Sequence, residues 1–129
     1  MARLHDIVFD CRHPASLARF WAAAMDGYEV APYDEAELAR LRGIGINDPE
    51  DDPTVLVEGP SAPRLFFQRV PEAKIVKNRV HLDLNADDPD AEVDRLIGLG
   101  ATRVVRRDEG EHGWVTLADP EGNELCVML

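Results

Sequence analysis

The chain is poor in basic residues, in cysteine and in long apolar runs, and each shortage excludes a class of protein. Only 14 Lys and Arg stand against 25 Asp and Glu in 129 residues, giving a net charge of −11. We therefore expect no nucleic-acid or membrane partner, because phosphate contacts need clustered basic side chains. Two cysteines, Cys11 and Cys126, do not make a disulfide scaffold. No apolar run approaches the roughly 18 residues that span a membrane, and no charged-then-apolar leader precedes the first predicted strand. A cytoplasmic protein is expected.

Instead, the chain holds one pattern twice. Residues 6–14 alternate between polar and apolar side chains and stop at Pro14, and residues 81–89 do the same and stop at Pro89. Helical periodicity follows each proline, which is a preferred residue in the first turn of a helix. Self-similarity over half a chain indicates two copies of one supersecondary unit.

The order of predicted elements is the same in both halves. In the first half we expect strands at 4–11, 28–31, 54–58 and 64–70, helices at 14–27 and 35–41, and an acidic loop at 47–53. In the second half we expect strands at 79–85, 102–106, 114–117 and 124–129 and a helix at 89–100. An apolar fraction of 45% suits a globular core. The prediction is one α+β domain, residues 1–129, of two βαβββ modules at approximately 1–73 and 79–129.

Strand alternation predicts which side chains face the helices, because neighbouring residues point to opposite faces of a sheet. The apolar set is expected to pack beneath the helices: Ile7, Phe9, Cys11, Leu65, Phe67, Leu82, Leu84, Val115, Leu117, Leu125, Val127 and Leu129. The opposite face of a curved mixed sheet then becomes an acidic cup with the helices on its outer side. Its predicted lining is Asp6, Asp10, Phe66, Gln68, His81, Asp83, Trp114, Thr116, Glu124 and Cys126.

The paired modules and the closing segment 119–127, DPEGNELCV, resemble the vicinal oxygen chelate superfamily. That superfamily includes glyoxalase I, extradiol dioxygenases, fosfomycin-resistance enzymes and bleomycin-binding proteins. The chain is similar to its small glyoxalase-like branch over essentially the whole length. The resemblance implies a small-molecule ligand and a homodimer.

Metal-dependent members place ligands early in the first strand, at the start of the fifth strand and in the last strand. The resemblance carries these positions to Asp6 and His81, which stand equally far before Pro14 and Pro89. The usual last-strand glutamate position holds Cys126 here, and Glu124 lies two residues earlier on the same face. Asp6, His81 and Glu124 are thus the predicted metal ligands, with His81 and Glu124 as catalytic groups. Zn²⁺, Ni²⁺, Mn²⁺ or Fe²⁺ would suit imidazole and carboxylates.

Each predicted site residue has a simpler interpretation. The acids can be solvated in an open groove, and His81 can be hydrogen-bonded locally. Trp114 and Phe66 can form a stacking platform for a planar ligand or can be packing. Cys126 lacks an adjacent base and is interpreted as inert, and His112 as a loop residue.

Three functions stay open at this point. The first is a metal-dependent lyase, isomerase or dioxygenase of glyoxalase type, acting on a compound with two neighbouring oxygens. The second is a metal-free protein that sequesters a small molecule such as a cationic antibiotic of the bleomycin type. The third is a module that serves only as a dimer partner.

Overall fold

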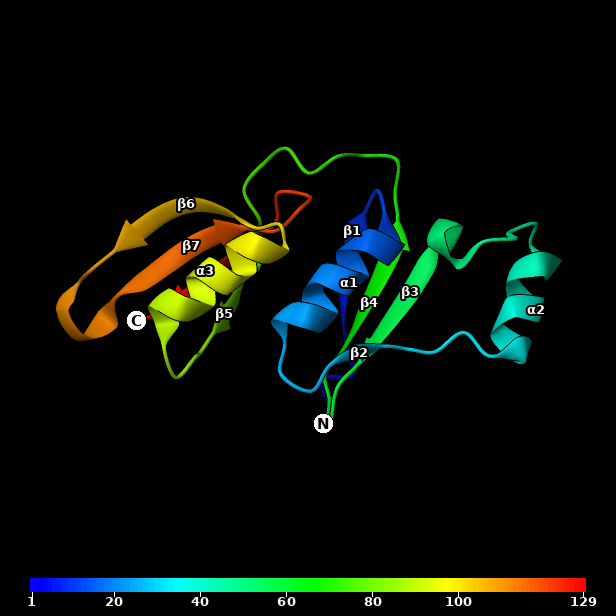
Figure 1. The fold of residues 1–129 in the computed structure, drawn as a ribbon, viewed down its shortest axis with the longest axis horizontal. Coiled ribbons are helices and arrows are strands. Elements are labelled where there is room, and N and C mark those ends of the chain that lie inside the picture. Colours follow the sequence, from blue (N-terminus) through cyan, green and yellow to red (C-terminus); the bar gives the residue numbers. More distant parts are fainter. The chain divides into compact units, whose positions relative to one another are not determined.

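A computed structural model describes residues 1–129. The chain forms two compact units, residues 1–73 and 74–129. The first unit contains β1 (Asp6–Cys11), α1 (Pro14–Ala24), β2 (Glu29–Val30), α2 (Glu35–Gly43), a 3₁₀ turn (Pro49–Asp51), β3 (Thr54–Glu58) and β4 (Arg64–Arg69). The second contains β5 (Leu82–Leu84), α3 (Pro89–Leu99), β6 (Thr102–Arg107), a 3₁₀ turn (Gly110–His112), β7 (Trp114–Ala118) and β8 (Glu124–Met128). Figure 1 shows each unit with a helix against its own sheet.

Both units have the same sheet topology. The strand order is β1-β4-β3-β2 in the first sheet and β5-β8-β7-β6 in the second. In each, the first and last strands of the unit pair in parallel, and the remaining neighbours pair antiparallel. The predicted α+β fold of two βαβββ modules is therefore confirmed.

The first core forms where α1 packs on β3 and β4. Trp21 and Leu17 on the helix and Phe67 on β4 are at most 1% exposed. The ring of Phe9 on β1 stacks on Phe67 at 5.0 Å between centroids and lies 5.1 Å from Trp21. Paired aromatic rings at these distances add to the free energy of burial.

The second core follows the same rule with aliphatic side chains. Val93 and Leu96 of α3 are buried, as are Val115, Leu117, Leu125 and Val127 of β7 and β8. The helix begins at Asp88, whose carboxylate accepts a hydrogen bond from Ala91 N–H, and ends at Gly100, whose φ of 124° favours glycine. The predicted helix and its boundaries are confirmed.

Helix α2 lies beyond the edge of the first sheet (Figure 1) and is fastened by one buried carboxylate. Asp52, 1% exposed, accepts hydrogen bonds from Tyr33 Oη at 2.7 Å and from the Thr54 N–H at 2.9 Å. The Arg40 guanidinium of α2 lies 3.5 Å from the same carboxylate. This network ties the helix to the chain on either side of it.

Replacing Tyr33 with phenylalanine is expected to lower the free energy of unfolding by about 1 kcal/mol, the usual net contribution of one buried hydrogen bond. Burial and the contact with Asp52 raise the pKa of the Tyr33 phenol, so this bond persists across the neutral range. Urea unfolding of both proteins measures the change. An unaltered midpoint would mean that the hydrogen bond between Tyr33 and Asp52 does not stabilise the fold.

Candidate functional site

The open face of the second sheet brings six predicted site residues together. His81 and Asp83 come from β5 and the residue before it, Trp114 and Thr116 from β7, and Glu124 and Cys126 from β8. All six line one pocket of about 700 Å³. The predicted helix-side residues Val115, Leu117, Leu125 and Val127 are fully buried, so strand alternation divides these strands as expected.

Hydrogen-bonded register places three of these residues in one row. Asp83 pairs with Cys126 across β5 and β8, and Cys126 pairs with Thr116 across β8 and β7. The Thr116 hydroxyl lies 3.4 Å from Cys126 Sγ. The corresponding row of the first sheet contains Val8, Phe66 and Leu56. One row therefore carries heteroatoms and the other only hydrocarbon.

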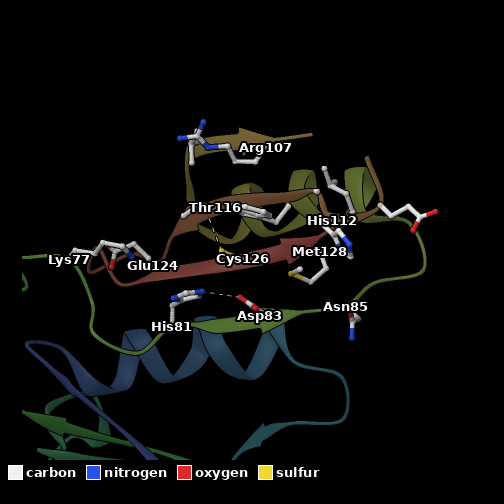
Figure 2. Close-up of a pocket in the computed structure, with 15 residues that line it drawn as sticks. Lys77, His81, Asp83, Asn85, Arg107, His112, Thr116, Glu124, Cys126 and Met128 are labelled. Atoms are coloured by element: carbon white, nitrogen blue, oxygen red, sulfur yellow. Dashed lines mark hydrogen bonds and ion pairs between the residues drawn. The ribbon is translucent and has the colours of Figure 1, made fainter. Parts of the chain in front are cut away.

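The site contains one cluster of reactive side chains, formed by His81, Asp83 and Cys126. The imidazole Nε2 of His81 lies 3.2 Å from Asp83 Oδ1. One ligand atom from each of the three residues lies within 4.8 Å of the others. Figure 2 shows the imidazole and the carboxylate turned toward each other beside the cysteine. A histidine, a carboxylate and a thiol at this spacing can hold a metal ion or exchange a proton.

The thiol of Cys126 is buried, with 6% of the residue exposed. Burial raises its pKa, and the contact with Thr116 opposes that rise only in part. The group is accordingly a thiol at neutral pH. Cys126 is predicted to be inert for lack of an adjacent base, but the His81 imidazole lies within 4.8 Å of its Sγ.

Glu124 is positioned by the turn that precedes β8. The Asp119 carboxylate accepts hydrogen bonds from the Glu121 and Asn123 N–H groups at 2.8 and 3.0 Å, and Gly122 has a φ of 91° that favours glycine. The Glu124 side chain, 15% exposed, accepts hydrogen bonds from Lys74 Nζ at 2.8 Å and Asn78 N–H at 3.1 Å. Burial alone would raise the pKa of this carboxyl, but the two donors outweigh it and lower the pKa to about 2.

Four predicted site residues belong to the first unit and are described there. Asp6 accepts hydrogen bonds from Arg64 at 2.8 and 3.1 Å, and this guanidinium lowers the pKa of the Asp6 carboxyl. Asp10 accepts a hydrogen bond from Gln68 Nε2 at 2.6 Å, and Phe66 is half-buried on the same face. The His5 imidazole lies 2.9 Å from the Arg64 guanidinium. Metal binding by Asp6, His81 and Glu124 stays a prediction.

The pocket also has lining residues that were not singled out as site residues. Met128 lies two residues after Cys126 in β8 and so shares its face, and Asn85 directly follows β5. Arg107 is the last residue of β6, and Glu111 and His112 lie in the connection between β6 and β7, where no periodic pattern marks them. The remaining lining residues are Lys77, Val105, Gly113 and Leu129. The charged side chains of the pocket are therefore of both signs.

The prediction for Leu129 is wrong. It was expected to pack beneath the helices with Leu125 and Val127, but it is 38% exposed and lines the pocket. The reason is that β8 ends at Met128, and the Leu129 N–H instead bonds to the Gly113 carbonyl at 2.9 Å. Alternation does not extend past the end of a strand.

Comparison with known proteins agrees with this architecture. The model of the family described as "Glyoxalase-like domain" matches residues 6–128. No match is found among curated proteins.

Solved structures resemble the chain over nearly its whole length. A glyoxalase/bleomycin resistance protein/dioxygenase family enzyme from Burkholderia phytofirmans PsJN is 17% identical, with a TM-score of 0.67 and 98% of each chain covered. The fosfomycin resistance protein FosX from Mesorhizobium loti is 12% identical, with a TM-score of 0.68, 99% of this chain and 91% of that one covered. A bleomycin-binding protein complexed with bleomycin is 14% identical, with a TM-score of 0.57 and coverage of 99% and 98%. At these identities the likeness concerns the fold.

Proposed function

The chain belongs to the glyoxalase-like domain family of the vicinal oxygen chelate superfamily, and on that premise we propose that it binds a small oxygenated aromatic molecule in the pocket of its second unit. The observation that carries the proposal is the division of the pocket's lining. Trp114, Met128 and Leu129 offer apolar surface, whereas His81, Asp83 and Thr116 offer hydrogen-bonding groups. Binding sites for small molecules combine apolar walls with a few polar groups in this way.

The volume and charge of the pocket indicate what kind of molecule fits. About 700 Å³ is within the usual range for small-molecule sites. Lys77 and Arg107 offset Asp83 and Glu111, and Glu124 is already paired with Lys74. A neutral ligand with neighbouring hydroxyl or carbonyl oxygens therefore suits the pocket better than a polycation.

The enzymatic form of the proposal assigns proton transfer to His81. Its imidazole is 42% exposed and contacts Asp83, which would orient the ring. A bound divalent ion would polarise a substrate oxygen, as in other lyases, isomerases or dioxygenases that use metals. Glu124, the other predicted catalytic group, would act only after release from Lys74.

A second candidate function is metal-free sequestration of a small molecule. It is favoured by the engagement of two predicted metal ligands, Asp6 with Arg64 and Glu124 with Lys74. A carboxylate already paired with a cation is a weaker metal ligand, because the pair must open first. The resemblance also implied a homodimer, which stays a prediction.

The two tryptophans allow a direct test of the pocket. In a ¹H–¹⁵N spectrum of the full chain, Trp21 and Trp114 give the two indole N–H signals, and Trp114→Phe assigns them. Catechol added to chelator-treated protein is expected to shift the Trp114 signal and leave that of Trp21, which is buried in the first core. Bleomycin is the probe for sequestration of a cationic antibiotic.

His81→Ala tests the polar side of the pocket, since it removes an exposed polar contact and leaves both cores intact. Catechol affinity should then fall by about tenfold, the loss expected for one hydrogen bond of about 1.4 kcal/mol. If catechol moves both indole signals or neither, the proposed pocket is wrong. A shift with bleomycin alone would favour sequestration.

A further inference from the structure

We infer that His81, Asp83 and Cys126 bind one thiophilic divalent metal ion, such as Zn²⁺, at a site contained entirely within the second unit. This set keeps His81 from the predicted set Asp6, His81 and Glu124, and it replaces the other two with Asp83 and with Cys126, which holds the usual last-strand glutamate position. The binding of the ion follows from the geometry of these three residues. Its role toward a ligand rests on the proposed function, because the ion would lie in the proposed pocket.

Backbone pairing brings two of the three residues together before any side chain moves. Asp83 and Cys126 are direct partners in the parallel ladder of β5 and β8. His81 immediately precedes β5, and its imidazole Nε2 lies 3.2 Å from Asp83 Oδ1. Two donors on paired strand positions and a third beside them would give a metal a partly preformed site.

The spacing of the donor atoms is close to that of a tetrahedral site. Bond lengths of about 2.0–2.3 Å place neighbouring ligand atoms roughly 3.3–3.8 Å apart around zinc. Nε2 of His81 and Oδ1 of Asp83 are 3.2 Å apart, and all three ligand atoms lie within 4.8 Å of one another. Side-chain rotations that shorten the longest separation by about 1 Å would complete the geometry.

The donor set selects among metals. Nitrogen, sulfur and one carboxylate oxygen favour Zn²⁺ and Co²⁺, while Mg²⁺ and Ca²⁺ prefer oxygen ligands alone. The Thr116 hydroxyl, 3.4 Å from Cys126 Sγ, can donate a hydrogen bond to the thiolate that metal binding would create. Cys126 is thus next to two other potential metal ligands and to a hydroxyl that can hydrogen-bond its sulfur.

Accessibility also fits a site with one open position. Cys126 is 6% exposed and lies at the base, whereas the side chains of His81 and Asp83 are 42% and 52% exposed. Three protein ligands with the fourth position open to solvent are the arrangement of catalytic zinc sites. The open position would face the same pocket as Trp114 and Met128.

Cobalt titration of the full chain tests the site, because a cobalt–thiolate bond gives a charge-transfer band that carboxylates and imidazole do not. We expect the band to saturate at one Co²⁺ per chain and to disappear when Zn²⁺ is added. Cys126→Ser should abolish the band, and His81→Ala should raise the dissociation constant for Co²⁺ by at least about tenfold, the loss that even outer partners of a metal site can cause. Cys11→Ser is the matched control, since Cys11 is the other buried cysteine and belongs to the first unit.

Other results of the titration would overturn the inference or distinguish this site from the predicted set Asp6, His81 and Glu124. Absence of the band, or its persistence in Cys126→Ser, would rule out the thiolate site. If Co²⁺ binds without that band and Glu124→Gln abolishes binding, the set Asp6, His81 and Glu124 is supported instead. Circular dichroism of each variant checks folding. A shift of Trp114 by catechol in chelator-treated protein with no cobalt band would sustain the proposed function and refute the metal site alone.

Discussion

Truncation of Phe67 to alanine is expected to lower the free energy of unfolding by about 3–5 kcal/mol, the range for removal of a fully buried aromatic side chain. Phe67 is 0% exposed, stacks on Phe9 at 5.0 Å and belongs to β4 at the centre of the first core. The substitution would remove the transfer free energy of the ring and leave a cavity that its neighbours fill only in part. Urea unfolding followed by circular dichroism measures the loss.

The adjacent residue provides the control. Phe66 is the same residue type on the same strand, but it points to the open face and is half-buried between Val8 and Leu56. Phe66→Ala should cost no more than about 1 kcal/mol, since much of its ring is already in contact with water. Equal losses for both variants would show that the face assignment of β4 is incorrect.

The contribution of Glu124 to stability is expected to depend strongly on pH. Its pKa is about 2 in the folded protein against an ordinary value of 4.5. Because the folded pKa is the lower one, the stabilisation is fully present above about pH 5 and is lost as the pH falls toward about 2. At neutral pH, Glu124→Gln is expected to reduce the free energy of unfolding by about 1–2 kcal/mol, through loss of a charged hydrogen bond.

The measurement is a comparison of urea unfolding curves for the parent and Glu124→Gln between neutral pH and pH 2. The two proteins should differ at neutral pH and converge as the acid is protonated. Lys74→Met breaks the same pair from the other side and should reproduce the neutral-pH loss, because Nζ of Lys74 lies 2.8 Å from the carboxylate. A constant difference at every pH would exclude Glu124 as the titrating group.

Most of the correct predictions about which residues are buried came from strand alternation. Leu65 and Phe67 are buried while Gln68 is exposed, as their positions along β4 required. Trp21 and Phe20 lie in the helix predicted at 14–27, and both are buried. These predictions succeed because a single apolar face must be covered, and a shift by one residue would expose it.

Boundaries were less predictable than alternation. The predicted strand 79–85 is shortened to Leu82–Leu84, so His81 precedes the strand. The acidic stretch 47–53, predicted as a loop, contains the 3₁₀ turn Pro49–Asp51, and Asp48 caps it by accepting the Glu50 N–H. Short turns depend on local hydrogen bonds that apolar periodicity does not record.

Contacts between distant segments lay outside what a pattern can predict. Lys74 and Asn78 lie between the two predicted modules, and their pairing with Glu124 depends on where the turn 119–122 places β8. Likewise, alternation put Asp83 and Cys126 on one face, and only the register of β5 against β8 makes them direct partners. The ladder offset depends on the packing of the whole unit.

The duplicated sheet has a consequence for how such a chain can change over evolutionary time. In each copy one face of the sheet is covered by a helix, while the middle row of the open side is occupied by Val8, Phe66 and Leu56 in one copy and Asp83, Cys126 and Thr116 in the other. Substitutions at the exposed members of that row, such as Val8 and Asp83, leave the buried side untouched and so cost little folding energy. A repeat can therefore acquire or lose reactive groups by point mutation, while its twin keeps an inherited scaffold intact.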